Sequence, residues 1–164
     1  MNFTLNISDS DLTQFESAMT AKLESLRQPV QSAMADALHG IVSANFGSHG
    51  FMRPWDWQEL SPAYAKKVGR TFATLSVSGA LKSTLRTDNS NPESSSVSMS
   101  KTGLVPYTFA HHYGNPENAG STKSGSGEMP ARRVFPLNAN GQVMEEAVKT
   151  VTQAAADAVK GALQ

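Results

Sequence analysis

Apolar residues recur at helical spacing from Leu12 to Phe46, the longest regular pattern in this 164-residue chain. Ser8 or Asp9 is placed to cap the start of a helix, and acidic residues in the first turn favour it electrostatically. The stripe in the first half is formed by Leu12, Phe15, Met19, Leu23 and Leu26. Beyond Pro29, which kinks or restarts a helix, it is continued by Val30, Ala33, Met34, Ala37, Leu38, Ile41 and Val42. The pattern predicts a long amphipathic helix that ends at the glycines of residues 47–50.

Two tryptophans and a helix-start signal follow this first helix. Trp55 and Trp57 lie in a predicted irregular connection after Pro54. Ser61 is a suitable cap and Pro62 a suitable first helical residue, where its missing N–H costs nothing. We expect a short helix from Pro62 that stops near residues 69–71.

Shorter patterns predict the remaining elements. Alternating apolar residues predict a strand at residues 2–7, and the segments 97–100 and 132–137 also resemble strands. The spacing of Leu81 and Leu85 favours one or two helical turns over residues 80–85, and the polar segment 87–96 is typical of a turn.

The last part of the chain combines a loop and a helix. Residues 115–128 are rich in Gly, Ser and Asn, which predicts a flexible loop. From Gly141 onward, apolar residues at a spacing of four predict an Ala-rich helix: Val143, Ala147, Val151 and Ala155. No repeat or internal boundary is evident, so residues 1–164 are expected to form one domain.

Composition narrows the class of protein. No apolar run approaches the roughly 20 residues that span a bilayer, and residues 1–10 do not resemble a signal peptide. The absence of Cys excludes disulfides and thiol chemistry. We expect folding in the cytoplasm and no membrane partner.

The charge is unevenly distributed although its formal sum is zero. Residues 1–50 carry five acidic and two basic side chains, whereas residues 51–114 carry seven basic and four acidic ones. Three explanations are open: solvated faces, head-to-tail contacts between copies, or a nucleic-acid surface. The last would use Lys66, Lys67, Arg70, Lys82 and Arg86.

The sequence gives little support to an enzyme. Adjacent His111 and His112 point in different directions in a helix or a strand, and neither His39 nor His49 stands at metal-ligand spacing from them. Ser78-Gly79 lacks the nucleophile-elbow pattern, and the glycines of residues 120–127 lack the phosphate-loop order. We therefore predict no catalytic, metal-binding or cofactor-binding residues.

Two groups of residues are candidates for an interface. Arg132 and Arg133 precede an apolar segment, and they either anchor a contact through their guanidinium groups or form a surface pair beside an edge strand. Trp55, Trp57 and Tyr64 either cover the core or act as interface anchors.

Four motifs occur in an order that resembles the virion-morphogenesis, or tail-completion, family of Mu-like tailed phages. The first comprises Trp57, Leu60-Ser61-Pro62, Tyr64-Ala65 and Lys67; the second comprises Ser78-Gly79, Leu81 and Ser83. The third comprises Tyr107, Ala110-His111 and Gly114; the fourth comprises Pro130-Ala131-Arg132 and Phe135. The Gly/Ser insertion before Pro130 and the pair Arg133-Val134 depart from the family pattern.

The resemblance implies an α+β fold in which helices pack a small antiparallel sheet and copies assemble into a ring, expected to be a hexamer. Such a ring would complete the tail and join it to the capsid connector at the neck of the virion, with genomic DNA passing through its lumen. Its neighbours would be tail-tube or tail-terminator proteins and the head–tail connector. The candidate interface residues are Trp55, Trp57, Tyr64, Lys67, His111, Arg132, Arg133 and Phe135. A transient assembly factor and a DNA-binding module remain as alternatives.

Overall fold

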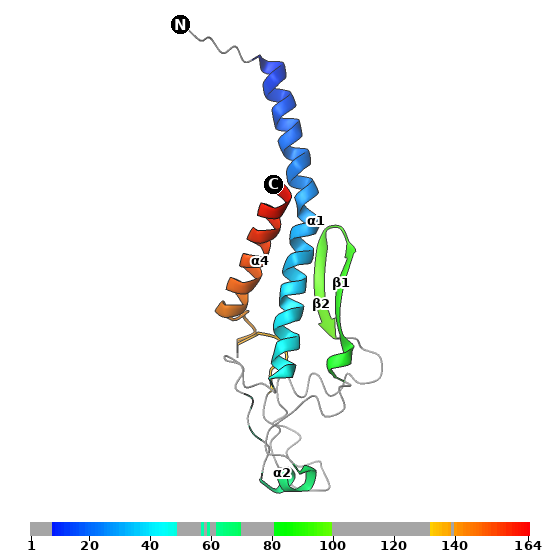
Figure 1. Cartoon of the computed structure of the whole chain (residues 1–164), viewed down its shortest axis with the longest axis vertical. Helices are drawn as coiled ribbons and strands as arrows, with labels where there is room; N and C mark the ends of the chain where they lie inside the picture. Colours follow the sequence, from blue (N-terminus) through cyan, green and yellow to red (C-terminus); the bar gives the residue numbers. More distant parts are fainter. Residues whose placement is uncertain are drawn as a thin grey trace.

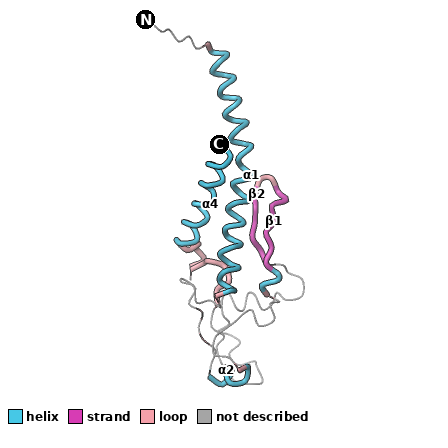
Figure 2. The backbone as a smooth tube through the Cα atoms, in the orientation of Figure 1, coloured by secondary structure: helices cyan, strands magenta, loops and turns pink. Residues whose placement is uncertain are grey.

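The computed structural model describes residues 8–48, 57, 59, 62–69, 81–99, 132–138 and 140–164; for Tyr64 and Val68 it describes the backbone alone. The elements are helices α1 (Asp9–Gly47), α2 (Pro62–Val68) and α4 (Glu145–Leu163), a 3-10 turn η1 (Lys82–Thr84), and strands β1 (Leu85–Asn91) and β2 (Ser94–Met99). The fold is α+β, as predicted, with two long helices and a two-stranded antiparallel sheet (Figures 1 and 2).

Helix α1 begins at the cap that the sequence predicts. The Ser8 hydroxyl accepts a hydrogen bond from the Asp11 backbone N–H (3.2 Å), and the Asp11 carboxylate accepts one from the Ser8 backbone N–H (3.0 Å). This reciprocal capping box satisfies backbone donors that the first turn cannot pair internally. The helix continues through Pro29 and ends where the Ser48 N–H donates to the Ala44 oxygen.

Helix α1 is the central element of the molecule. Helix α4 packs along one side of it, and the β1–β2 hairpin packs against another side (Figure 1). The N-terminal part of α1 extends beyond both of these neighbours (Figure 1). Burial along α1 begins only at Leu26. The buried residues of this helix are Leu26, Ala35, Val42, Asn45 and Phe46.

The hairpin corrects two predictions. The polar segment 87–96 is not a turn: β1 extends to Asn91, and only Pro92 and Glu93 connect it to β2. Similarly, the predicted helical turns at 80–85 reduce to η1, and Leu85 opens the strand. Leu85 is buried and Thr87 is half-buried, because alternate residues of β1 are directed toward α1. Tertiary packing on one face of the strand therefore overrides its polar composition.

A tight turn before α4 corrects two further predictions. Residues 132–137 form an irregular segment rather than a strand, and it contributes one isolated bridge between Leu137 and Val143. The Asn138 carboxamide oxygen accepts hydrogen bonds from the N–H groups of Asn140 and Gln142, both at 2.9 Å. Gly141 has φ of 76°, a conformation that favours glycine. Helix α4 consequently begins at Glu145 rather than near Gly141.

Helix α2 begins at Pro62 as predicted and is followed by Gly69, which has φ of 68°. This left-handed conformation is the common way to end a helix. The predicted strand at residues 2–7, the loop at 115–128 and the capping role of Ser61 lie outside the described residues.

Candidate interface

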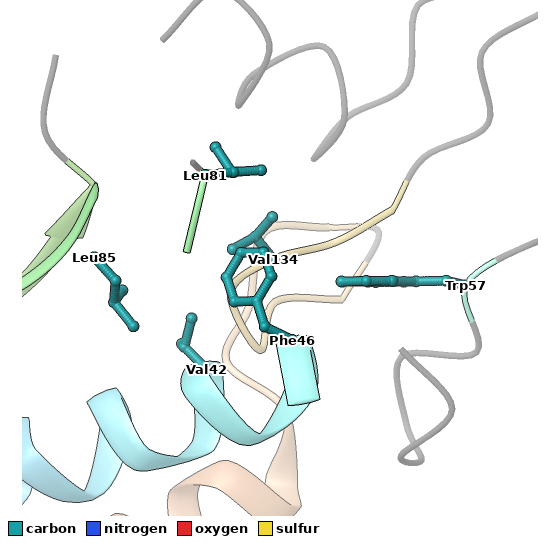
Figure 3. Packing of buried hydrophobic residues seen from close by; sticks show 6 residues of the cluster. All are labelled: Val42, Phe46, Trp57, Leu81, Leu85 and Val134. Atoms are coloured by element: carbon teal, nitrogen blue, oxygen red, sulfur yellow. The ribbon is translucent and has the colours of Figure 1, made fainter. Parts of the chain in front are cut away.

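Described residues of several motifs lie close together at the C-terminal end of α1. Six buried apolar side chains form one cluster there: Val42, Phe46, Trp57, Leu81, Leu85 and Val134 (Figure 3). They come from α1, from the segment around residue 57, from residues 81–85 and from the segment before α4. Trp57 and Leu81 belong to the first and second motifs, and Phe135 of the fourth motif packs against the cluster, which we call the motif core.

Trp57 joins two of these segments. Its indole Nε1 donates a hydrogen bond of 2.9 Å to the main-chain oxygen of Arg133. The same oxygen accepts a hydrogen bond from the Asn45 carboxamide at 3.2 Å. The indole ring also meets Phe46 edge-to-face, with ring centroids 6.1 Å apart, a favourable geometry for aromatic pairs. One aromatic residue thus fixes both α1 and the 132–135 segment.

The exposure of Trp57 and Arg132 bears on the alternatives that the sequence left open for them. Trp57 is 4% exposed, so it belongs to the core of a single chain. Arg132 is 7% exposed, so it is not half of a surface pair, and no edge strand lies beside it within residues 132–138. Arg133 and Phe135 are half-buried, and Phe135 packs against the motif core.

The other candidate residues are placed differently. Lys67 is exposed on α2, which lies apart from α1 in Figure 1. Tyr64 belongs to the same helix. Trp55 and His111 lie outside the described residues. The structure therefore brings Trp57, Arg132, Arg133 and Phe135 together and leaves Lys67 separate from them.

A second surface was not recognised as a site from the sequence. Four large apolar side chains of the N-terminal part of α1 are exposed: Leu12 (51%), Phe15 (62%), Met19 (45%) and Leu23 (63%). We call these four residues the α1 stripe. The sequence predicted the stripe itself but did not indicate that it would be solvent-exposed, because exposure depends on where the packing partners of α1 end.

Both packing partners end close to residues 22–27. The Lys22 ammonium donates a hydrogen bond of 2.9 Å to the main-chain oxygen of Ala162, in the last turn of α4. At the tip of the hairpin, Glu93 forms an ion pair with Arg27 (2.6 Å) and accepts a hydrogen bond from Gln31 (3.0 Å) at its main-chain oxygen. On the N-terminal side of these contacts, no described element covers the α1 stripe.

The basic residues considered for nucleic-acid binding do not form a single described patch. Lys66 and Lys67 are exposed on α2, while Lys82 and Arg86 lie at the base of the hairpin. The Arg86 guanidinium donates to the main-chain oxygens of Ser83 and Leu85. Arg70 lies outside the described residues. The described basic residues therefore add no support to the DNA-binding alternative.

The described residues also bear on metal binding and on membrane insertion. None of their His, Asp and Glu side chains gather in a group of three or more that could hold a metal ion. Within the same residues, no helix combines the length and the apolar character needed to cross a membrane.

Comparisons of the chain with protein-family models, with curated proteins and with solved structures find no match.

Proposed function

We propose that this chain is a structural protein of the virion neck of a tailed phage, where copies form a ring that completes the tail and joins it to the capsid connector. The observation that carries the proposal is the ordered set of four motifs between Trp57 and Phe135. DNA would pass through the lumen of the ring without sequence-specific contacts.

The motif core supports this proposal. Trp57 and Leu81, from the first and second motifs, belong to it, and Phe135 of the fourth motif packs against it, although long stretches of sequence separate them. Motifs that converge on one packed centre constrain one fold, whereas unrelated resemblances have no reason to converge. The converging residues are aromatic, aliphatic and main-chain groups, which suits a structural part more than a catalytic site.

The arrangement also suits a subunit that presents an exposed surface apart from its packed centre. The motif core fixes the C-terminal end of α1, and α2 carries the exposed motif residue Lys67. A ring requires heterologous contacts, in which one surface of a copy meets a different surface of the next. We assign Lys67 to such a contact. An image of the ring would identify the residues of the neighbouring copy that contact Lys67.

Electron microscopy of the purified protein and of phage particles tests the proposal. We expect closed rings in the purified sample, and we expect the protein to be present at the head–tail junction of mature particles. A persistent monomer that is absent from mature particles would overturn the proposal in favour of a transient assembly factor.

A pair of variants on α2 tests the role of Lys67. Lys66 and Lys67 are adjacent and both exposed, but only Lys67 belongs to a motif. We expect Lys67→Glu to reduce ring formation and Lys66→Glu to leave it close to that of the unmodified protein. Equal effects would remove Lys67 from the interface. Unchanged circular dichroism in both variants would show that the fold is intact.

A further inference from the structure

We infer that the α1 stripe is a self-association surface, on which the N-terminal half of α1 pairs antiparallel with the same segment of a second copy. This inference does not depend on the proposed function. The pair is isologous, since the same surface is used by both copies, and it therefore differs from the heterologous contact that a ring needs.

Exposure of a continuous apolar stripe is the first observation. Leu12, Phe15, Met19 and Leu23 recur at the spacing of one helix face, and each is at least 45% exposed. Single exposed apolar residues are ordinary in proteins, whereas a contiguous apolar surface usually marks a contact. Leu163, next to the Ala162 that accepts the Lys22 hydrogen bond, is also exposed and adds apolar surface at the end of α4.

The spacing of the stripe is symmetric about Met19. Phe15 and Leu23 lie four residues to either side of it, and Leu12 and Leu26 lie seven residues to either side. A two-fold axis at Met19 therefore places Met19 against Met19, Phe15 against Leu23, and Leu12 near Leu26. Leu26 is 8% exposed, so its contribution is limited to the edge of the contact.

Charges beside the stripe are complementary under the same axis. Asp9, Asp11 and Glu16 precede Met19, whereas Lys22 and Arg27 follow it. At about 100° per residue, Asp11 and Lys22 flank one side of the stripe, while Asp9, Glu16 and Arg27 flank the other. The remaining acid of this segment, Glu24, lies farther around the helix.

An antiparallel pair consequently brings acids of one copy beside bases of the other on both sides of the stripe, where Lys22 and Arg27 also keep their contacts with Ala162 and Glu93 of their own chain. A parallel pair in register would instead bring opposite flanks together and place Asp9 of one copy near Asp11 of the other, which is unfavourable. The acidic N-terminal half also disfavours an anionic membrane as the occupant, since such surfaces attract basic segments. The charges therefore favour a second copy in the antiparallel orientation.

The size of the contact predicts its strength. Fewer residues are available on each copy than the roughly 20–30 of a standard interface. We therefore expect reversible dimers with a Kd in the micromolar range rather than a permanent dimer.

Sedimentation of the full chain over a range of concentrations tests the association. We expect a monomer–dimer equilibrium that Phe15→Glu shifts at least tenfold toward monomer. Val148→Glu is the matched control, since Val148 is an apolar residue of α4 with comparable exposure outside the stripe; we expect it to leave the equilibrium unchanged. A monomer at every concentration, or equal effects of the two variants, would overturn the inference.

Cross-linking determines the orientation, and the absence of native Cys makes it direct. Phe15→Cys and Leu23→Cys variants, carrying tags of different size, are mixed and treated with a short bis-maleimide. The antiparallel pair predicts that mixed cross-links between the two variants exceed cross-links within either variant. Predominance of cross-links within each variant would indicate a parallel pair and overturn the inferred arrangement. Rings seen by electron microscopy together with failure of both tests would separate this inference from the proposed function.

Discussion

The indole Nε1 of Trp57 donates a hydrogen bond of 2.9 Å to the main-chain oxygen of Arg133, which lies 76 residues later in the chain. This bond links the first motif to the fourth, and the Asn45 carboxamide links the same oxygen to α1. A main-chain acceptor constrains the identity of the donor at position 57 but not the side chain of Arg133. Indole is the only aromatic side chain that combines a large apolar surface with an N–H donor.

Substitution of Trp57 should separate its hydrogen bond from its packing. Trp57→Phe keeps an aromatic ring but removes the donor to Arg133, and we expect a loss of about 1–3 kcal/mol in the free energy of unfolding. Trp57→Ala also opens a cavity beside Phe46, and we expect a loss of about 3–5 kcal/mol. Urea denaturation followed by circular dichroism measures both values. Equal losses in the two variants would contradict a separate contribution from packing.

Arg132 should contribute to the stability of a single chain. Because its side chain is 7% exposed, we expect Arg132→Ala to lower the free energy of unfolding by about 1–3 kcal/mol through lost packing and hydrogen bonding. Arg132→Lys keeps the charge but not the planar fork of donors, so it should recover part of the loss at most. Unchanged stability together with impaired ring formation would instead place the role of Arg132 in an interface.

Pro29 should limit the stability of α1. A proline inside a helix removes one backbone hydrogen bond and crowds the preceding turn, and Pro29 is exposed on its helix. We expect Pro29→Ala to stabilise the protein by about 1–3 kcal/mol, and Pro29→Gly to give about 1 kcal/mol less than alanine. Thermal denaturation measures the difference. A lower melting temperature for Pro29→Ala would show that the proline fits a local geometry that α1 requires.

Acid should loosen the first turn of α1. Hydrogen bonds from the Ser8 side chain and backbone hold the pKa of Asp11 below its ordinary value. A carboxylate whose pKa is lower in the folded state stabilises the fold above its unfolded pKa, and this contribution is lost as the pH falls through the folded pKa. The unfolded value is about 3.9, so we expect the capping box to open progressively below about pH 4.

The amide resonances of Ser8 and Asp11, followed by NMR against pH, check this expectation. Asp11→Asn should remove the transition at Ser8. Asp88, whose pKa is lowered by its hydrogen bonds with Ser90, should show a separate local transition in β1 that this variant leaves intact. A Ser8 transition that persists in Asp11→Asn would contradict the assignment to the capping box.

The ion pair between Arg27 and Glu93 should contribute little to stability. Both side chains remain substantially exposed, at 46% and 65%, and exposed pairs typically contribute about 0–1 kcal/mol because water and salt screen them. Glu93→Gln should therefore lower the free energy of unfolding by less than about 1 kcal/mol, and added salt should reduce the difference further. The hydrogen bond from Gln31 to the main chain of residue 93 is unaffected by this change. A larger, salt-independent loss would contradict the screened character of the pair.

The part of the site that could be predicted differs from residue to residue. The sequence identified Trp57 and Arg132 as important but left open whether they face a core or an interface. Their burial follows from segments that approach from distant parts of the chain, and no local pattern encodes that approach. Conversely, the sequence predicts the α1 stripe as one face of an amphipathic helix, and only the structure shows that this face is exposed.

The sequence by itself determined where α1 begins and where α2 begins and ends. Ser8 caps α1, Pro62 opens α2 and Gly69 follows its end, because capping and backbone preference act between residues that are close in sequence. Only the tertiary structure decided that polar residues 87–91 form a strand, that the segment before α4 is a turn rather than a strand, and that Trp57 meets Arg133. It also decided that the α1 stripe is exposed. These outcomes depend on contacts between distant segments, whose free energy exceeds the weak local preferences of the residues involved.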